Sequence, residues 1–228
     1  MNAHLQEIER SMSEYTLVIG NKNYSSWSMR PWLVLRQAGA DFDEIVIPLR
    51  QSDSKERILA QSPAGKVPIL KHGDRIIWDS LAIFEYLAER FPGKGLWPDD
   101  AEARALARSV SAEMHSGFPA LRNHMPMDLR SRHPGKGFGE GVIDDIKRIS
   151  DLWSDCRVRF GDGGPFLFGH FSMADAMYAP VVGRFVTYGV NLPPSAKEYV
   201  EAVWNHPHVW EWRDAAEKEP WTLEFDLV

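Results

Sequence analysis

Three serines lie together at the predicted start of a helix, where side-chain hydroxyls have a defined chemical use. Ser25, Ser26 and Ser28 belong to a polar loop that leads into a stretch with helical apolar spacing. Pro31 lacks a backbone N–H and fits best in the first turn of a helix, so the sequence predicts a helix that begins near Ser28. Hydroxyl donors at the positive end of a helix dipole stabilise an anion, although serine also caps helices without any further role.

A second group of this kind opens a later helix. Asp79 and Ser80 precede apolar residues at helical spacing. Backbone N–H and hydroxyl groups at a helix N-terminus form a site for an anion. A simple helix cap is the alternative interpretation, and both roles are compatible.

The elements that carry these residues form an α/β unit. A strand is predicted over residues 15–20, because the run is β-branched and stops at Gly20 and Asn21. The following helix closes at Gly39, where glycine is typical of a helix C-terminus. The remaining elements are a strand over 42–49, a short helix over 55–61, a strand over 67–71, a turn over 72–74, a strand over 75–78 and the helix opened by Asp79. The order is therefore βαβ followed by ββα.

The second half of the chain has a different pattern. Residues 103–217 show helical apolar spacing interrupted by Pro134-Gly135 and by the segment 161–165, with no alternating strand. Ser172 and Asp175 have the spacing of a capping box, which predicts a helix start. The predicted organisation is an extension over 1–14, an α/β domain over 15–92, a linker over 93–102 and an all-helical domain over 103–228.

Composition excludes several classes of function. The formal net charge is −6 and no run of Lys or Arg exceeds two residues, so the field that attracts nucleic acid is missing. The first 15 residues lack the apolar core of a secretory signal, and no later stretch reaches the length of a membrane span. We therefore expect a cytoplasmic protein that binds neither nucleic acid nor membranes.

The cysteine and histidine content predicts neither a disulfide nor a metal site. Cys156 is the single cysteine and lies on a predicted apolar helix face, so we interpret it as a core residue. That face consists of Val142, Ile146, Ile149, Trp153, Cys156 and Phe160. His206 and His208 are too close in sequence to form a zinc site without a third partner.

The chain resembles the glutathione transferase family through motifs that occur in the order this fold requires. The serine loop is similar to the SSCSxR loop of the zeta class, and Ser172 to Asp175 is similar to the (S/T)xAD cap of a C-terminal helix. Residues 62–68 are similar to the NPxGxVP segment with its cis-proline, and residues 79–83 are similar to the (E/D)S(x)AI start of the third helix. The resemblance implies a thioredoxin-like N-terminal domain, an all-helical C-terminal domain, glutathione as co-substrate and a homodimer.

The resemblance also implies roles for individual residues. Ser25 or Ser26 would donate a hydrogen bond to the glutathione thiolate; the zeta-like match favours Ser25, whereas theta-like loops favour Ser26. Asp79 and Ser80 would bind the ammonium and carboxylate of the γ-glutamyl end. The other contacts are Val67 before a cis bond to Pro68, for the cysteinyl amide, and Lys66 for the glycine carboxylate.

The pocket for the second substrate, a small hydrophobic electrophile, is expected between the serine loop and the first helix of the second domain. Its expected lining is Trp27, Met114, Phe118 and Met125, although such methionines and phenylalanines are more often core residues. Glu113 and His115 could contact a polar substrate, but isolated polar residues on a helix usually face solvent.

One departure from the family pattern limits the function. Trp27 occupies the position of the cysteine in the zeta-like loop, which weakens an assignment as maleylacetoacetate isomerase. Branches whose chemistry needs a thiol in this loop are also disfavoured, because Cys156 is the first cysteine of the chain. The predicted function is a glutathione S-transferase that conjugates small electrophiles, or a glutathione-dependent peroxidase. The alternatives are a glutathione-dependent cis–trans isomerase and a non-catalytic interaction protein with the same fold.

Overall fold

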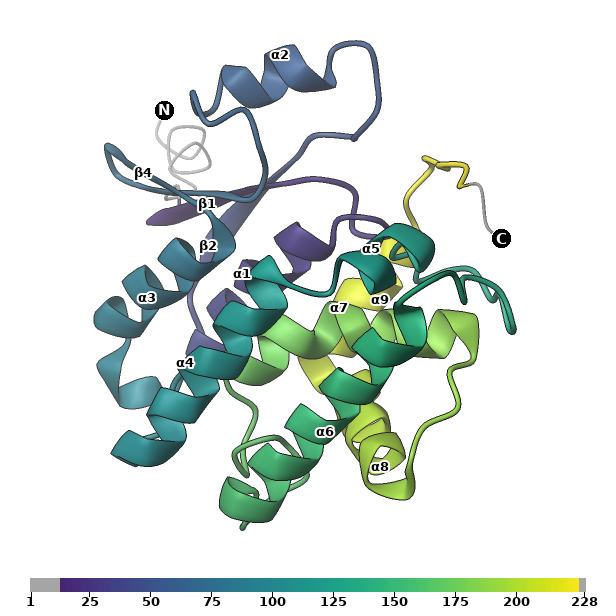
Figure 1. Cartoon of the computed structure of the whole chain (residues 1–228). Coiled ribbons are helices and arrows are strands. Elements are labelled where there is room, and N and C mark those ends of the chain that lie inside the picture. The colour runs from purple at the N-terminus through teal and green to yellow at the C-terminus, as the bar shows by residue number, and fades with distance from the viewer. Residues whose placement is uncertain (1–12, 226–228) are drawn as a thin grey trace, which may run out of the picture.

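The computed structural model describes residues 13–225 and places a four-stranded sheet beside a group of helices (Figure 1). The sheet has the order β2-β1-β3-β4, in which β1 and β2 are parallel and the other neighbours are antiparallel. In the register, Tyr15 of β1 lies opposite Phe42 of β2 and His72 of β3. The strands are β1 (Tyr15–Ile19), β2 (Phe42–Val46), β3 (Ile69–His72) and β4 (Arg75–Trp78).

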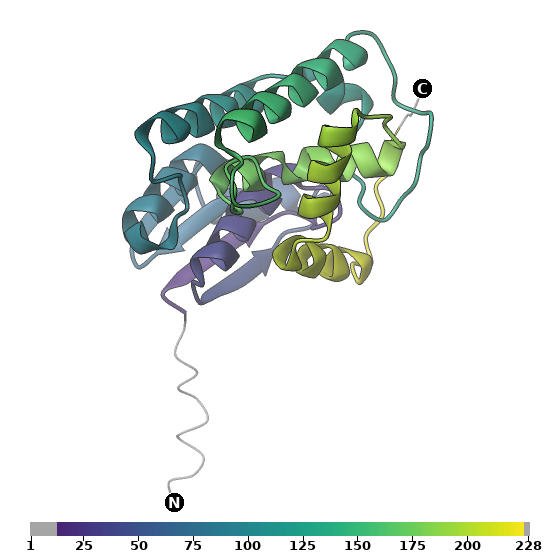
Figure 2. The same cartoon turned by 90° about the horizontal axis from the view of Figure 1, so that it is seen from below.

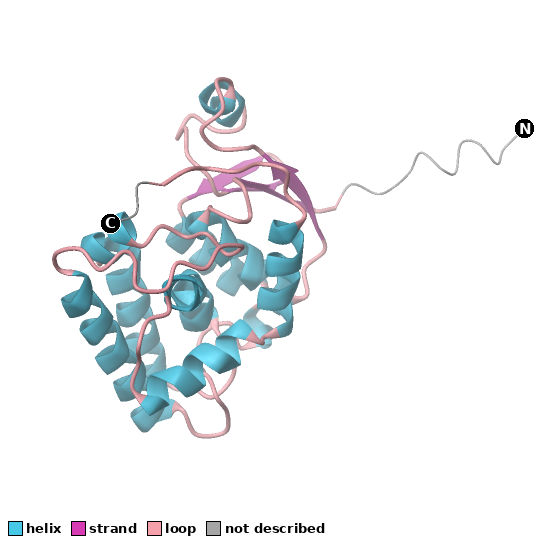
Figure 3. Ribbon diagram, turned by 90° about the vertical axis from the view of Figure 1, so that its right-hand side faces the viewer, coloured by secondary structure: helices cyan, strands magenta, loops and turns pink. Residues whose placement is uncertain are grey.

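Three helices accompany the sheet and complete the predicted βαβ–ββα order. They are α1 (Ser26–Ala38), α2 (Ser54–Leu59) and α3 (Ser80–Arg90). Figure 3 shows α2 on one face of the sheet and the main body of helices on the other. The buried residues of α1 and α3 join the same core as the second half of the chain, so the N-termini of both helices lie near the helical domain.

Several predicted boundaries were wrong by a few residues, for local reasons. Helix α1 begins at Ser26 because Ser25 caps it, and Pro31 therefore lies inside the helix rather than in its first turn. Strand β2 ends at Val46, two residues before Pro48, and β3 begins after Pro68; neither proline has an N–H to pair in a sheet. The predicted extension over 1–14 lies almost wholly outside the described residues.

After β4 the only regular secondary structure among the described residues is helical, apart from isolated bridges within 166–170. A 3-10 turn, Pro92–Lys94, leads to α4 (Ala101–Ser116), α5 (Pro119–His124), α6 (Val142–Phe160), α7 (Met173–Tyr188), α8 (Pro194–Trp204) and α9 (Pro207–Glu217). Figure 2 shows α7 in the middle of these helices. It is buried along nearly its whole length, as expected for a helix that is apolar on all sides. None of the described helices is long and apolar enough to cross a bilayer.

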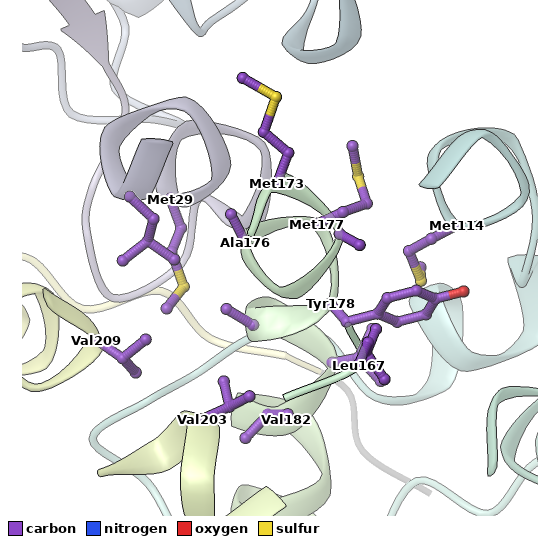
Figure 4. Close-up of a cluster of buried hydrophobic side chains, with 14 of the residues drawn as sticks. Met29, Met114, Leu167, Met173, Ala176, Met177, Tyr178, Val182, Val203 and Val209 are labelled. Carbon is purple, nitrogen blue, oxygen red and sulfur yellow. The ribbon is translucent and has the colours of Figure 1, made fainter. Parts of the chain in front are cut away.

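The main core lies where α7 meets α1 and α4. Figure 4 shows the contributing side chains, among them Met29 of α1, Met114 of α4 and Met177 of α7. Two sequence predictions are confirmed around this core. Cys156 is buried on α6, and burial raises the pKa of its thiol to about 12, as expected of a core cysteine. Ser172 and Asp175 form the predicted capping box of α7.

His206 is expected to make the stability of the helical domain depend on pH. Its ring stacks on Phe171 at 4.0 Å, and its Nδ1 accepts the His208 N–H at the start of α9. Burial, assisted by His208, lowers the pKa of His206 to about 4. A depressed pKa stabilises the fold above the unfolded value of about 6.5, and this contribution is lost as the pH falls towards 4.

We expect the free energy of unfolding to fall by about 1–2 kcal/mol between pH 6.5 and 4 because of this histidine, after allowance for its partial exposure. The His206→Asn variant keeps a capping acceptor and should lose this part of the pH dependence. Urea titrations at several pH values measure the difference, with His133→Asn as the control for loss of a histidine elsewhere. Parallel pH profiles for wild type and His206→Asn would contradict the prediction.

Candidate active site

An open cleft of about 690 Å³ lies between the sheet domain and the end of α4. It collects residues from four separate segments of the chain: the start of α1, the loop before β3, the start of α3 and the last turn of α4. Its lining is Trp27, Ala64, Lys66, Val67, Pro68, Trp78, Asp79 and His115. The predicted residues Trp27, Lys66, Val67, Pro68 and Asp79 are therefore brought together, and the Val67–Pro68 bond is cis.

Asp79 and Ser80 form the N-terminus of α3 at the edge of this cleft. Asp79 Oδ1 accepts the Leu81 N–H at 2.9 Å, so the carboxylate caps the helix as well as facing the cleft. Its backbone has a φ of 73°, a conformation that costs a non-glycine residue of order 1–3 kcal/mol. The Ser80 side chain is buried, and its hydroxyl has no hydrogen-bond partner among the residues the structure describes. A buried hydroxyl without a partner is unfavourable, and a ligand oxygen would satisfy it.

The carboxylate of Asp79 also pairs with a residue of the helical domain. His115 Nε2 lies 3.0 Å and 2.9 Å from the two oxygens of Asp79. The sequence suggested that His115 faces solvent, and the contact was not predictable because the two residues are 36 positions apart. Glu113, the other polar residue considered there, forms an ion pair with Arg148 and does not line the cleft.

The serine loop is organised by hydrogen bonds behind Trp27. The Gly20 N–H donates to Ser28 Oγ at 3.0 Å, and Ser28 Oγ lies 2.7 Å from Ser25 Oγ. The Ser28 N–H also donates to Ser25 Oγ, at 3.4 Å. If the Ser28 hydroxyl is the donor in its hydrogen bond to Ser25 Oγ, the Ser25 hydroxyl can donate a hydrogen bond to a further acceptor.

Neither Ser25 nor Ser26 belongs to the lining of the cleft, although both precede Trp27, which does. Ser26 is the first residue of α1 and is buried.

Trp27 is the residue of this loop that lines the cleft and contacts the helical domain there. Its ring packs against the edge of His115, with centroids 5.1 Å apart. The guanidinium carbon of Arg30 lies 4.5 Å from the ring centroid, and that of Arg122 lies 4.9 Å from it. Both arginines favour negative charge near the indole, and neither was identified as a site residue from the sequence.

The predicted apolar lining of the electrophile pocket requires correction. Met114, Phe118 and Met125 are buried in the main core and do not border the cleft. Figure 4 shows Met114 beside Tyr178 of α7. Helix α4 packs against α7, so its apolar face points away from the cleft and the polar His115 is the residue that borders it.

The described residues contain no group of three His, Cys, Asp or Glu side chains arranged to hold a metal ion. The polar side chains that line the cleft are instead a carboxylate, an imidazole and an ammonium group. This set of donors and acceptors suits an organic ligand that carries several charges.

Comparisons with known proteins agree with this geometry. The sequence model described as "Glutathione S-transferase, N-terminal domain" matches residues 21–95, and "Glutathione S-transferase, C-terminal domain" matches residues 112–215. A probable maleylacetoacetate isomerase of Caenorhabditis elegans is 34% identical over 159 residues, which cover 68% of this chain and 73% of the relative. A chloroplastic glutathione S-transferase L2 of Arabidopsis thaliana is 26% identical over 164 residues, 70% of this chain but half of that protein.

Solved structures give the same result for the fold. A glutathione transferase homologue from Burkholderia, solved with bound glutathione, has a TM-score of 0.68 and 28% identity, covering 90% of this chain and 99% of that one. A Tau class glutathione S-transferase from mango has a TM-score of 0.68 and 21% identity, covering 90% and 96%. The thioredoxin-like N-terminal domain and the helical C-terminal domain predicted from the sequence are thereby confirmed.

Proposed function

The chain belongs to the glutathione S-transferase family, and from this premise we propose that it binds glutathione in the cleft beside Trp27 and conjugates its thiolate to small electrophiles. The observation that carries the proposal is the convergence of Lys66, Val67, Asp79 and the neighbouring Ser80 at one cleft. These are the residues whose motifs resemble the glutathione-binding segments of the family, and they come from different parts of the chain.

Each charged end of the tripeptide has a complementary group. Asp79 offers a carboxylate to the γ-glutamyl ammonium, and the buried Ser80 hydroxyl and the N-terminus of α3 offer donors to its carboxylate. The exposed Lys66 lies on the lining, where it can meet the glycine carboxylate. The backbone N–H and C=O of Val67 are proposed to pair with the cysteinyl amide.

The thiol is proposed to be activated by a serine hydroxyl. The hydrogen bonds from Gly20 through Ser28 to Ser25 support Ser25 as the donor, because a hydroxyl that accepts two hydrogen bonds becomes a better donor itself. Ser26 remains the alternative. In the reaction the thiol proton passes to solvent, the sulfur forms a bond to the electrophilic carbon, and the leaving group departs with the bonding electrons.

Glutathione binding is the first test of the proposal. We expect glutathione to elute the protein from a glutathione resin and to give a binding signal in calorimetry. Asp79→Asn should weaken binding about tenfold, because the ammonium loses a charged partner. Asp74→Asn, in the exposed turn of the same hairpin, is the matched control and should bind normally. A wild-type protein that neither binds the resin nor gives heat with glutathione would rule out the proposed function.

A glutathione-dependent isomerase is the second candidate, supported by the 34% identity to a probable maleylacetoacetate isomerase. Assays with a chloronitrobenzene, a hydroperoxide and maleylacetone separate transferase, peroxidase and isomerase activity.

The homodimer that the family resemblance implies is part of the proposal, and sedimentation at the mass of a single chain would contradict it.

A further inference from the structure

Three arginines without carboxylate partners lie together where α1, α5 and α7 meet. Arg30 of α1 and Arg184 of α7 are 0% and 5% exposed, and Arg122 of α5 is half-buried. Within the part of the chain that is described, none of the three forms a salt bridge, whereas Arg36 on the same helix α1 pairs with Glu211. Burial of an unpaired cation costs several kcal/mol, and three neighbouring cations increase this cost.

The three side chains are held in place by backbone carbonyls, and Arg122 also donates from Nη2 to the carbonyl oxygens of Met114 and His115. In each case the Nε atom donates to a carbonyl oxygen. The contacts are Arg30 to Met177 at 3.1 Å, Arg122 to Gly117 at 2.9 Å and Arg184 to Met125 at 2.7 Å. The guanidinium groups are therefore fixed in orientation before any ligand arrives.

The donors that remain are buried. Both terminal nitrogens of Arg30, and Nη1 of Arg184, have no hydrogen-bond partner among residues 13–225. Burial and the mutual repulsion of the three cations lower the pKa of Arg30 and, to about 9, that of Arg184. The unpartnered nitrogens and the lowered pKa values both reflect one feature, which is that no negative charge among the described residues lies against these arginines.

The cluster adjoins the cleft through Trp27. The indole ring lies against both Arg30 and Arg122, at 4.5 Å and 4.9 Å, and the same ring lines the cleft. Two carboxylates that act electrostatically on the cluster are engaged elsewhere: Asp79 pairs with His115, and Asp145 accepts the Leu121 N–H at 2.9 Å. Among the described residues the cluster therefore has no paired negative charge, which a ligand would supply.

We propose that Arg30, Arg122 and Arg184 form a binding site for a carboxylate of the electrophilic substrate, so that the enzyme selects electrophiles that carry this group. The inference rests on the proposed function, because the carboxylate is placed on the second substrate. The two free nitrogens of Arg30 form a planar fork, which matches the two oxygens of a carboxylate. The arginines also offset the repulsion between an anionic substrate and the glutathione thiolate.

Activity with two matched substrates tests the selectivity. 4-Chloro-3,5-dinitrobenzoate and its neutral carboxamide share the leaving chloride and differ in charge. After correction for their uncatalysed rates with glutathione, we expect wild-type kcat/KM to favour the benzoate roughly 10- to 100-fold. Arg30→Met and Arg122→Met should reduce this ratio to about one.

The matched control is Arg36→Met, which removes an arginine that also packs on a tryptophan of α1 but has a carboxylate partner. It should keep the preference. Equal corrected values in wild type, or a preference that survives in both Arg30→Met and Arg122→Met, would overturn the inference. If Arg30→Met does not fold, the substrate preference of Arg122→Met alone decides the test.

Thermal unfolding without glutathione tests the site separately from the proposed function. At constant ionic strength, benzoate should raise the melting temperature of wild type and of Arg36→Met but not of Arg30→Met or Arg122→Met. A response to sulfate or phosphate alone would identify a site for free inorganic anions, and no response at all would indicate bound water; either result overturns the carboxylate assignment. If glutathione fails to bind while the benzoate response is present, the proposed function is wrong and the anion site is retained.

Discussion

Glutathione bound to the Ser25→Ala variant is expected to keep its thiol protonated at neutral pH. The ordinary thiol pKa is about 8.5, and a hydrogen bond to a charged group contributes about 1.5–3 kcal/mol. Loss of the Ser25 donor should therefore raise the pKa of the bound thiol by about 1–2 units relative to wild type. Conjugation at pH 7 should fall roughly 10- to 100-fold. Ultraviolet absorbance of the bound thiolate as a function of pH measures the shift.

Three companion variants separate this role from helix capping. Ser25→Thr keeps both the hydroxyl and the cap and should retain most of the activation. Ser28→Ala removes the hydroxyl that lies 2.7 Å from Ser25 and should raise the thiol pKa by a smaller amount. Ser26→Ala tests the alternative donor. If Ser26→Ala shifts the thiol pKa and Ser25→Ala does not, the role belongs to Ser26; if neither does, serine activation is wrong.

The Asp175→Ala variant is expected to lose about 3–5 kcal/mol of unfolding free energy. The Asp175 carboxylate is fully buried and accepts hydrogen bonds from the Leu167 N–H, the Ser172 N–H and hydroxyl, and the Tyr199 hydroxyl, at 2.9–3.1 Å. These bonds join the loop before α7 to the start of α7 and to α8. Alanine would leave several buried donors without an acceptor.

Urea denaturation measures this loss. Asp151→Ala is the matched control, because Asp151 is exposed on α6 and pairs with Lys147 four residues away. Such surface pairs contribute about 0.5 kcal/mol or less. A loss below about 1 kcal/mol in Asp175→Ala would show that the buried carboxylate does not hold the helical domain together.

Local patterns in the sequence were sufficient for most of the fold. The apolar stripe through Ile149 and Cys156 identified the buried face of α6, and the spacing of Ser172 and Asp175 identified the start of α7. These features were predictable because helical periodicity and capping depend on residues within a few positions of one another. The predicted start of α1 near Ser28 was two residues too late. Pro31 was expected in the first turn, whereas Ser25 caps the helix and Pro31 lies further inside it.

The residues of the candidate site were predictable where they belong to one short sequence motif. Contacts between the two domains were not predictable. Local sequence patterns predicted the α/β unit, the helical second half, the hydroxyls ahead of α1 and the Asp79-Ser80 start of α3. Only the folded arrangement shows that Met114 faces the core, that His115 reaches Asp79, and that Arg30 and Arg122 both lie against Trp27. These contacts join residues tens of positions apart, and their geometry depends on how α4, α5 and α7 pack against α1, which no local pattern contains.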